Sequence, residues 1–314
     1  MIKFWFDKFR YGRASHRIRA HIPCEALKSM GYDSAIVRDT NSLTDEDIVI
    51  FTKDSNIENM RTVKSKGFKV GFDLCDNKFD EKPIYYDYCK EVDFITVNSN
   101  TMKEVVKTNT GRDSFYYTDC VDRKISPPIG EKINTPIKLV WYGSSASNKY
   151  VDWVAVIKNL ESAKINYTIT ICVDRAEYLR GKFLRNLKGL DVDPNKFIHK
   201  DWTWELQQQL VEEADIVFIP ILGADGRRTI TKSHNRVVDG IAQGKWVISS
   251  PVPSYDVLKK FCWLEDPAAG IEYYKNNQQE VNEKIKAGQE WIKQNVSPEA
   301  TAKQLIKIYN EVKI

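Results

Sequence analysis

Short apolar runs alternate with helical patterns along most of this chain, and this alternation limits the possible folds more than any other feature. Five runs in the first hundred residues have the length of buried strands: Ile2–Phe6, Ser34–Arg38, Asp47–Thr52, Phe68–Asp73 and Phe94–Asn98. Helical stretches lie between them, the first over roughly Ser15–Met30, and Gly31 and Gly67 stand where helices are expected to end. Strands that alternate with helices predict a parallel sheet with helices on both faces.

The same pattern starts again after Asn134-Thr-Pro136, which we interpret as a hinge. The second series of predicted strands comprises Ile137–Tyr142, Tyr167–Val173, Lys196–His199, Asp215–Ile221 and Lys245–Ser249. Two doubly wound units are expected to face each other across a cleft, where the carboxyl ends of open parallel sheets bind ligands. We therefore expect one Rossmann-like domain over residues 1–133, a second over 134–295, and a C-terminal helix over 296–314.

Composition excludes several other classes of protein. The 314 residues are 42% hydrophobic and 29% charged, which is typical of a soluble globular chain. The 47 basic against 43 acidic residues exclude a globally basic nucleic-acid binder, although a local basic patch remains possible. No run reaches the roughly 18 apolar residues of a transmembrane segment. Six widely spaced cysteines predict reduced thiols in a cytoplasmic protein, and the four histidines lack the spacing of metal ligands, so we expect no metal.

The most informative segment is a polar loop that leads into a helix ending near Gly244. The helix start carries four polar residues: Lys232, Ser233, Asn235 and Arg236. A helix N-terminus offers free N–H groups and positive potential, and two added cations predict a diphosphate site there. Asp239 lies about one turn further along, where a carboxylate can accept hydrogen bonds from ribose hydroxyls. A solvated helix start with an Arg236–Asp239 ion pair is the alternative interpretation.

This segment resembles the donor-binding signature of GT-B glycosyltransferases, especially the family 4-like group. The stretch Ala242-Gln-Gly-Lys-Trp-Val-Ile248 is similar to the A-x-G-x-P-V-I turn of that family. Asp239 matches the second of two acidic positions, which holds the nucleotide ribose, whereas the first falls on Thr231 and is absent. Lys232, Asn235 and Arg236 resemble a basic variant of the motif that holds the phosphates.

Further stretches fit the same resemblance. Leu139–Ser145 resembles the first strand and glycine turn of the donor domain, so Gly143 and Ser144 are expected near a phosphate, with Lys149 as a phosphate-binding lysine. Phe197–Trp202 resembles the turn that lines the base pocket. Trp202 could stack on the base, and a core or capping role stays open for it. In this fold the terminal helix is expected to cross back onto the first domain.

The acceptor side is expected at the start of the chain. Ala14–Leu27 resembles the S-x-R-I-R start of the first helix in this group, and six of the first 20 residues are basic. Arg13, just before this stretch, and Ser15 and Arg17 within it could hold a phosphate of donor or acceptor, with an exposed helix face as the alternative. His16 could serve as an acid or base. Asp73 and Asp76 follow a buried strand and could orient an acceptor hydroxyl or act as the base. Structural roles remain open for all three.

The resemblance implies transfer of a sugar from a nucleotide-diphosphate sugar, UDP-sugar favoured, to an acceptor hydroxyl. We expect the reaction to need no metal or other cofactor and to retain the anomeric configuration. The expected acceptor is a glycan or lipid-linked glycan; a hydroxymethylated DNA base, as in phage enzymes, is the alternative. A nucleotide-sugar epimerase and a non-catalytic binding protein are further alternatives. The location would be the cytoplasm, the inner membrane face, or a host cytoplasm for a phage protein. The sequence leaves the oligomeric state open.

Overall fold

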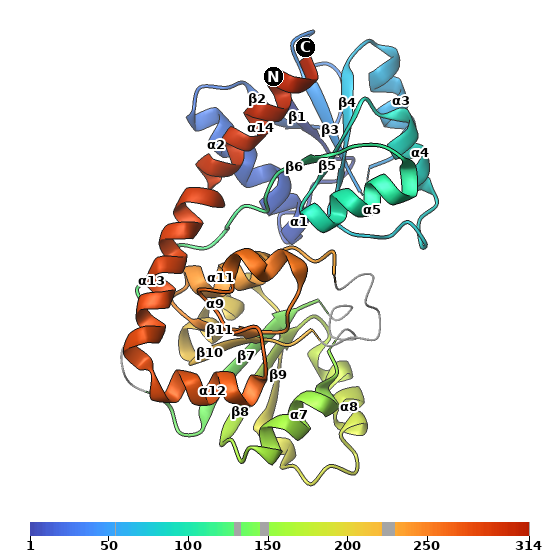
Figure 1. Cartoon of the computed structure of the whole chain (residues 1–314). Coiled ribbons are helices and arrows are strands. Elements are labelled where there is room, and N and C mark those ends of the chain that lie inside the picture. The colour runs from blue at the N-terminus through green and yellow to red at the C-terminus, as the bar shows by residue number, and fades with distance from the viewer. Residues whose placement is uncertain (54, 129–132, 145–150, 222–229, 314) are drawn as a thin grey trace. The chain divides into compact units, whose positions relative to one another are not determined.

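The computed structural model describes residues 1–53, 55–128, 133–144, 151–221 and 230–313 (Figure 1). The chain groups into two compact units. Unit 1 consists of Met1–Asp122, Ile230–Asn235 and Trp291–Ile314, and unit 2 of Arg123–Thr229 and Arg236–Glu290. The segment 230–235 therefore belongs to unit 1, although it lies between two parts of unit 2 in the sequence. The predicted boundaries after residues 133 and 295 stay predictions.

Unit 1 is built on a parallel sheet with the strand order β2-β1-β3-β4-β5-β6. Its strands are β1 (Ile2–Trp5), β2 (Ser34–Val37), β3 (Ile48–Thr52), β4 (Lys69–Leu74), β5 (Phe94–Val97) and β6 (Phe115–Tyr116). Five of them match predicted strands; β6 was not predicted, because two residues carry no readable pattern. Alternate residues of β3 enter different cores, with Val49 and Phe51 in one and Ile48 and Ile50 in the other. Both faces of the sheet are therefore covered, as parallel sheets require.

The helices of unit 1 divide between these two cores (Figure 1). Three contribute to the core of Val49 and Phe51: α3 (Ile57–Ser65), α4 (Ile84–Glu91) and α5 (Asn100–Thr110). Two contribute to the other: α2 (Ile22–Ser29) and α14 (Pro298–Lys313). The chain enters α2 through the short helix α1 (Ala14–His16) and a π-helical turn, Arg17–His21. Gly31 and Gly67 have φ of 86° and 90° just after α2 and α3, as glycines at helix ends often do.

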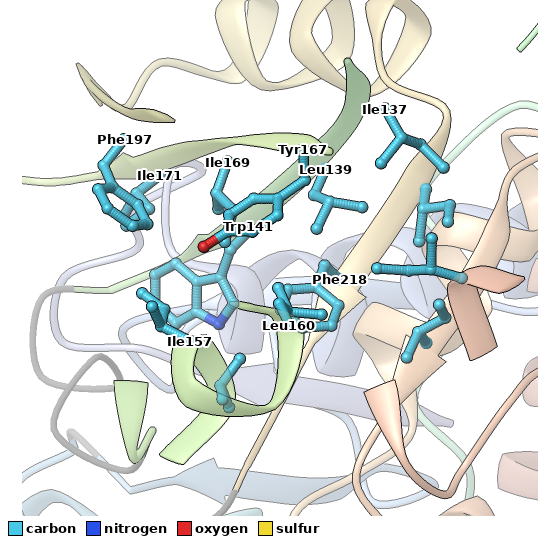
Figure 2. Close-up of a cluster of buried hydrophobic side chains, with 14 of the residues drawn as sticks. Ile137, Leu139, Trp141, Ile157, Leu160, Tyr167, Ile169, Ile171, Phe197 and Phe218 are labelled. Atoms are coloured by element: carbon cyan, nitrogen blue, oxygen red, sulfur yellow. The ribbon is translucent and has the colours of Figure 1, made fainter. Parts of the chain in front are cut away.

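Unit 2 contains a second parallel sheet, with the order β11-β10-β7-β8-β9. Its strands are β7 (Ile137–Gly143), β8 (Tyr167–Val173), β9 (Phe197–Asp201), β10 (Ile216–Ile219) and β11 (Trp246–Ser249). The helices are α7 (Trp153–Ser162), α8 (Ala176–Asn186), α9 (Trp204–Glu213), α11 (Asn235–Ala242), α12 (Pro267–Asn276) and α13 (Gln278–Asn295). The first residue of α11 and the residues of α13 from Trp291 on group with unit 1. Trp141 of β7 lies fully buried in a core with Ile157, Leu160 and Phe218 (Figure 2).

The predicted fold class, two doubly wound parallel-sheet domains with C-terminal helices, is confirmed in its sheets and helices. In each sheet the strand order reverses beside the first strand: between β1 and β3 in unit 1, and between β7 and β10 in unit 2. Open α/β sheets bind ligands at the carboxyl ends of strands at such a reversal. The carboxyl ends of β1 and β7 are therefore the places to look for a site. Among the described helices, none has the length and apolar character to cross a membrane.

Candidate functional site

The guanidinium of Arg236, a residue of α11, lies at the carboxyl end of β7. Its Nη1 donates a hydrogen bond to the Tyr142 carbonyl (3.2 Å), and the Tyr142 hydroxyl donates to the Arg236 carbonyl (3.2 Å). The guanidinium carbon also lies 5.8 Å from the centroid of the Trp141 ring. A Cβ built on Gly143 would stand 3.3 Å from Arg236 Nη1 and 3.1 Å from the Trp141 ring. Glycine at this position therefore leaves room for the guanidinium, and two predicted site residues meet here.

The helix that carries Arg236 packs closely on the sheet. A Cβ on Gly240 of α11 would lie 2.6 Å from Val247 Cγ2 of β11, so the glycine permits the close approach. Asn235 begins α11, and the half-buried Asp239 lies one turn after it. The positive end of the helix dipole and the Arg236 guanidinium both favour an anion at this end of the helix.

Tyr255 lies buried near Arg236 in unit 2. Among the described residues its hydroxyl has no hydrogen-bond partner. Burial raises the pKa of Tyr255, and the positive charge of Arg236 opposes that rise. No sequence pattern marks this tyrosine, because a buried hydroxyl has no local signature.

The predicted nucleoside-side tryptophan follows β9. Trp202 is half-buried, and its indole Nε1 donates to Gln207 Oε1 at 2.7 Å. The capping alternative therefore has a contact in its favour, and stacking on a base stays a prediction. Arg123, which the sequence analysis missed, lies 3.4 Å from the centroid of the neighbouring Trp204 ring. Ser144 is exposed just after β7, whereas Lys149 lies outside the described residues.

At the carboxyl end of β4 in unit 1, Asp73 is buried in a network with Arg19. Arg19 donates to it through Nε (3.1 Å to Oδ2) and Nη2 (2.5 Å to Oδ1), and Thr96 Oγ1 adds a bond of 2.7 Å. Arg19 Nη1 also donates to Asp119 Oδ1 (3.3 Å), and the guanidinium lies 3.4 Å over the Tyr117 ring. Asp73 thus has buried partners in unit 1, which favours its structural alternative, and its predicted catalytic role stays a prediction.

Two further predicted residues of unit 1, His16 and Arg17, also face the interior. Arg17 Nε donates to Asp122 Oδ2 at 2.6 Å, and Nη1 donates to the Tyr11 carbonyl at 2.9 Å. His16 Nδ1 accepts from the Arg10 backbone N–H at 3.0 Å. Both side chains are buried and fix the loop after β1, which favours the structural alternative. The phosphate role of Arg17 and the acid–base role of His16 stay predictions. Arg13 is exposed and Ser15 is half-buried.

Asp76, the second predicted carboxylate, is more accessible. Its side chain is 29% exposed and forms an ion pair with Lys53, which follows β3. Burial would raise the pKa of Asp76, but the charges of Lys53 and Lys232 outweigh it and lower the pKa. An ionised carboxylate with a lowered pKa is a weak proton acceptor. It is better suited to orienting a hydroxyl than to removing its proton.

The segment 230–235 places Lys232 in the neighbourhood of Asp76. Burial raises the pKa of Asp119, and the neighbouring Arg19 and Ser233 side chains oppose that rise. The ring of His234 is buried, with Nε2 3.4 Å from Thr118 Oγ1, and burial lowers its pKa to about 4. The predicted diphosphate residues are therefore divided. Lys232, Ser233 and Asn235 group with unit 1, and Gly143, Ser144 and Arg236 group with unit 2. Within the described ranges, no group of three His, Cys, Asp or Glu residues is arranged to hold a metal ion.

No protein-family model matches this chain, and no curated protein matches its sequence. Solved structures do match. HepE from Anabaena, with UDP and glucose, has a TM-score of 0.67 at 13% identity over 98% of this chain and 99% of that one. An α-glucosyltransferase (AGT) in complex with UDP has a TM-score of 0.68 at 10% identity over 98% and 99%. TarM has a TM-score of 0.66 at 12% identity, over 86% of this chain and 57% of its own.

The chain spans a little over half of TarM and GtfA, which it covers to 57% and 59%. It spans nearly the whole of HepE and AGT. At these identities the likeness concerns the fold, and the fold is GT-B, the architecture of these glycosyltransferases. The resemblance to GT-B glycosyltransferases that the sequence suggested is confirmed at this level.

Proposed function

We propose that this protein is a glycosyltransferase that uses a nucleotide-diphosphate sugar, with a UDP-sugar favoured. The observation that carries the proposal is the place of Arg236, on Gly143 at the carboxyl end of β7 and in the first turn of α11. A diphosphate there would meet a guanidinium and the positive end of a helix dipole together. Solved structures of the same fold that contain UDP support the choice of nucleotide.

The chemistry follows from the charge that develops on the leaving diphosphate. Arg236 and Lys232, with Lys149 and Ser144 as further candidates, would stabilise that charge, so the proposed reaction needs no metal or other cofactor. Asp239 would accept hydrogen bonds from the ribose, and Trp202 would lie against the base. Retention is proposed because the leaving phosphate can itself take the acceptor proton. The lowered pKa of Asp76 supports this route, since it makes that carboxylate a poor base.

Nucleotide binding to the intact protein tests this proposal. UDP at about 100 times its Kd should stabilise the folded protein by about 2.7 kcal/mol, visible as a higher Tm, whereas ADP and GDP should do less. Arg236→Ala should weaken UDP binding about tenfold or more, because a hydrogen bond to a charged group is lost. Arg180→Ala, on an exposed site of α8 in the same unit, is the matched control. No stabilisation by any nucleoside diphosphate or its sugars would refute the donor site.

For the acceptor we propose a glycan or lipid-linked glycan hydroxyl, with a phosphodiester-bearing acceptor such as modified DNA as the second candidate. The loop after β1 favours the second candidate. Lys8, Arg10, Tyr11 and Arg13 are exposed there, while buried His16 and Arg17 hold the loop backbone. Cations beside an exposed ring match a phosphate backbone with accessible bases.

Labelled sugar from the donor separates these two acceptors. Transfer to glycan, insensitive to Lys8→Gln and Arg10→Gln, supports the first candidate. Transfer to duplex DNA carrying hydroxymethylated bases, weakened by salt, supports the second. Each lysine or arginine that contacts a phosphate should contribute about 0.9 to the slope of log affinity against log salt. Replacing both residues should therefore flatten that slope.

A further inference from the structure

Helix α8 of unit 2 (Figure 1) carries an excess of positive charge on its exposed side. Between residues 175 and 188 the sequence has one acidic residue, Glu177. Five basic residues share this stretch, and all of them are exposed: Arg175, Arg180, Lys182, Arg185 and Lys188. The net charge of this short stretch is therefore +4, equal to that of the whole chain.

These cations have no acidic partners, unlike cations of several other helices. In α12, for example, Lys275 pairs with Glu272 at i,i+3, at a distance of 2.8 Å. Glu177 and Arg180 stand at the same spacing in α8, yet none of its five basic residues forms an ion pair with a described residue. The positive charge of α8 is therefore not neutralised within the described part of the chain.

The cations of α8 also stand close to one another along the helix. Lys182, Arg185 and Lys188 follow at intervals of three residues, and no acidic residue stands three or four positions from Lys182 or Arg185. Like charges at such spacing lie on neighbouring positions of a helix surface and repel each other. An anionic partner would relieve this repulsion.

An exposed aromatic ring lies among these cations. Tyr178 is 69% exposed, the largest fraction among the exposed large hydrophobic side chains of the described residues. Lys182 stands one turn after it, and Arg185 two turns after it, on the same side of the helix. Gly181 lies between them, and a Cβ built there would meet only Arg185 Nη1, at 3.6 Å. The guanidinium therefore extends back beside Gly181, one turn from Tyr178.

The opposite side of α8 is already part of the core. Leu179 and Phe183 are buried there, and the Phe183 ring meets Phe197 and His199 of β9 at centroid distances of 5.0 and 5.1 Å. A helix that binds a lipid surface inserts an apolar face of its own. Because the apolar face of α8 is used within unit 2, a bilayer is a poor partner for this helix.

A single-stranded nucleic acid fits the exposed face better. Arginine and lysine neutralise phosphates along such a strand, and an exposed ring can stack on an unpaired base. The 11 residues of α8 span about 16 Å, which is enough for a few nucleotides.

We propose that the face formed by Tyr178, Lys182 and Arg185 binds single-stranded nucleic acid. The two cations contact phosphates, and the tyrosine ring stacks on a base. None of the three residues belongs to the proposed donor site, so this inference does not depend on the proposed function.

Binding of a fluorescently labelled single strand of about 20 nucleotides to the full chain, without donor, tests the inference. Lys182→Gln/Arg185→Gln should lower the affinity about tenfold. It should also reduce the slope of log affinity against log salt by about 1.4, since each phosphate contact contributes about 0.7. Tyr178→Ala should lower the affinity about tenfold, whereas Tyr178→Phe keeps the ring and should bind like the wild type. The Tm of the double variant should stay unchanged or rise slightly, because like charges are removed.

Lys303→Gln/Lys307→Gln is the matched control. Both lysines are exposed on α14 of unit 1, so this double variant removes the same total charge from another place. Its affinity for the strand should equal that of the wild type. The variants of α8 should in turn leave the Kd for UDP unchanged.

The inference is overturned if the control variant loses as much affinity as Lys182→Gln/Arg185→Gln, because binding then follows total charge. It is also overturned if Tyr178→Ala binds the strand like the wild type. Vesicles containing phosphatidylglycerol provide a further comparison. If the protein sediments with them through Lys182 and Arg185 but does not bind the strand, the partner is a lipid surface and the assignment is wrong. These results leave the donor assignment untouched, since UDP binding tests it separately.

Discussion

The two units use arginine in opposite ways at the carboxyl ends of their first strands. In unit 1, Arg17 and Arg19 are buried and bound to carboxylates. In unit 2, Arg236 is half-buried, and its contacts at β7 are a backbone carbonyl and an aromatic ring. A guanidinium in a buried ion pair is committed to the fold, because separating the pair leaves an uncompensated charge. The position of an arginine in the topology therefore does not decide its function; its partners do.

The largest effect should follow from breaking the unit 1 network. Arg19→Met removes the cation that Asp73 and Asp119 share, leaving two buried carboxylates. The free energy of unfolding should fall by about 3–5 kcal/mol, as when one member of a buried ion pair is lost. Urea denaturation measures this loss.

Arg236→Met provides the comparison for that measurement. The contacts of Arg236 at β7 are a neutral carbonyl and a ring, and losing them should cost about 1.5–3 kcal/mol, less than the loss expected for Arg19→Met. Equal losses for the two variants would mean that the contrast between the units is wrong.

Acidification should lower the free energy of unfolding by a smaller amount, and the loss should be larger in unit 1. Burial lowers the pKa of His234 to about 4, against about 6.5 in an unfolded chain. Between these values the unfolded chain binds the extra proton, so stability is full above pH 6.5 and falls as the pH drops toward 4. Complete protonation of His234 should cost about 3 kcal/mol.

His199 of unit 2 offers a parallel case. Burial lowers its pKa to about 4, and the charge of Arg180 acts in the same direction. His199 is less buried than His234, so water should reduce the cost of its protonation. We would measure the free energy of unfolding over this pH range for the wild type, His234→Gln and His199→Gln. The differences separate the contributions of the two histidines. A wild-type curve parallel to that of His234→Gln would contradict the assignment.

The sequence predicted the strands of both units better than the contacts between their buried side chains. Alternation of apolar runs located ten of the eleven strands in the described residues, since each strand is a local feature. It also predicted that Gly143 and Arg236 lie close together. Gly143 ends a strand and Arg236 lies at the start of a helix, and parallel topology brings such ends to the same edge of the sheet.

The buried charges of unit 1 could not be predicted in the same way. Arg19 and Asp119 are 100 residues apart, and no local pattern marks them as partners. The sequence predicts one continuous helix across Ser15–Met30, whereas the structure has a π-helical turn at Arg17–His21. The wider turn changes which side chains face inward, and it buries Arg17, Ile18 and Arg19 together.

Arg236→Lys should weaken UDP binding moderately. It tests which property of the arginine in unit 2 matters, its charge or its planar guanidinium. Lysine keeps the positive charge but loses the planar fork that can meet two phosphate oxygens and lie against an aromatic ring. We expect UDP affinity to fall about tenfold with little change in Tm. Calorimetric titration measures the affinity. An unchanged Kd would show that charge alone, rather than guanidinium geometry, holds the diphosphate.

The smallest effect should come from Gly143→Ala, which leaves every polar group in place. The new Cβ would stand 3.1 Å from the Trp141 ring and 3.3 Å from Arg236 Nη1, so the guanidinium must shift by a few tenths of an ångström. UDP affinity should fall about threefold, less than 1 kcal/mol. Gly181→Ala on α8 is the matched control, because its Cβ would meet only Arg185 Nη1, at an ordinary 3.6 Å. If Gly143 acts only through Arg236, adding Gly143→Ala to Arg236→Ala should have no further effect. An additional loss would show that the β7 turn itself contacts the donor, and that unit 2 binds phosphate through its backbone as well as its arginine.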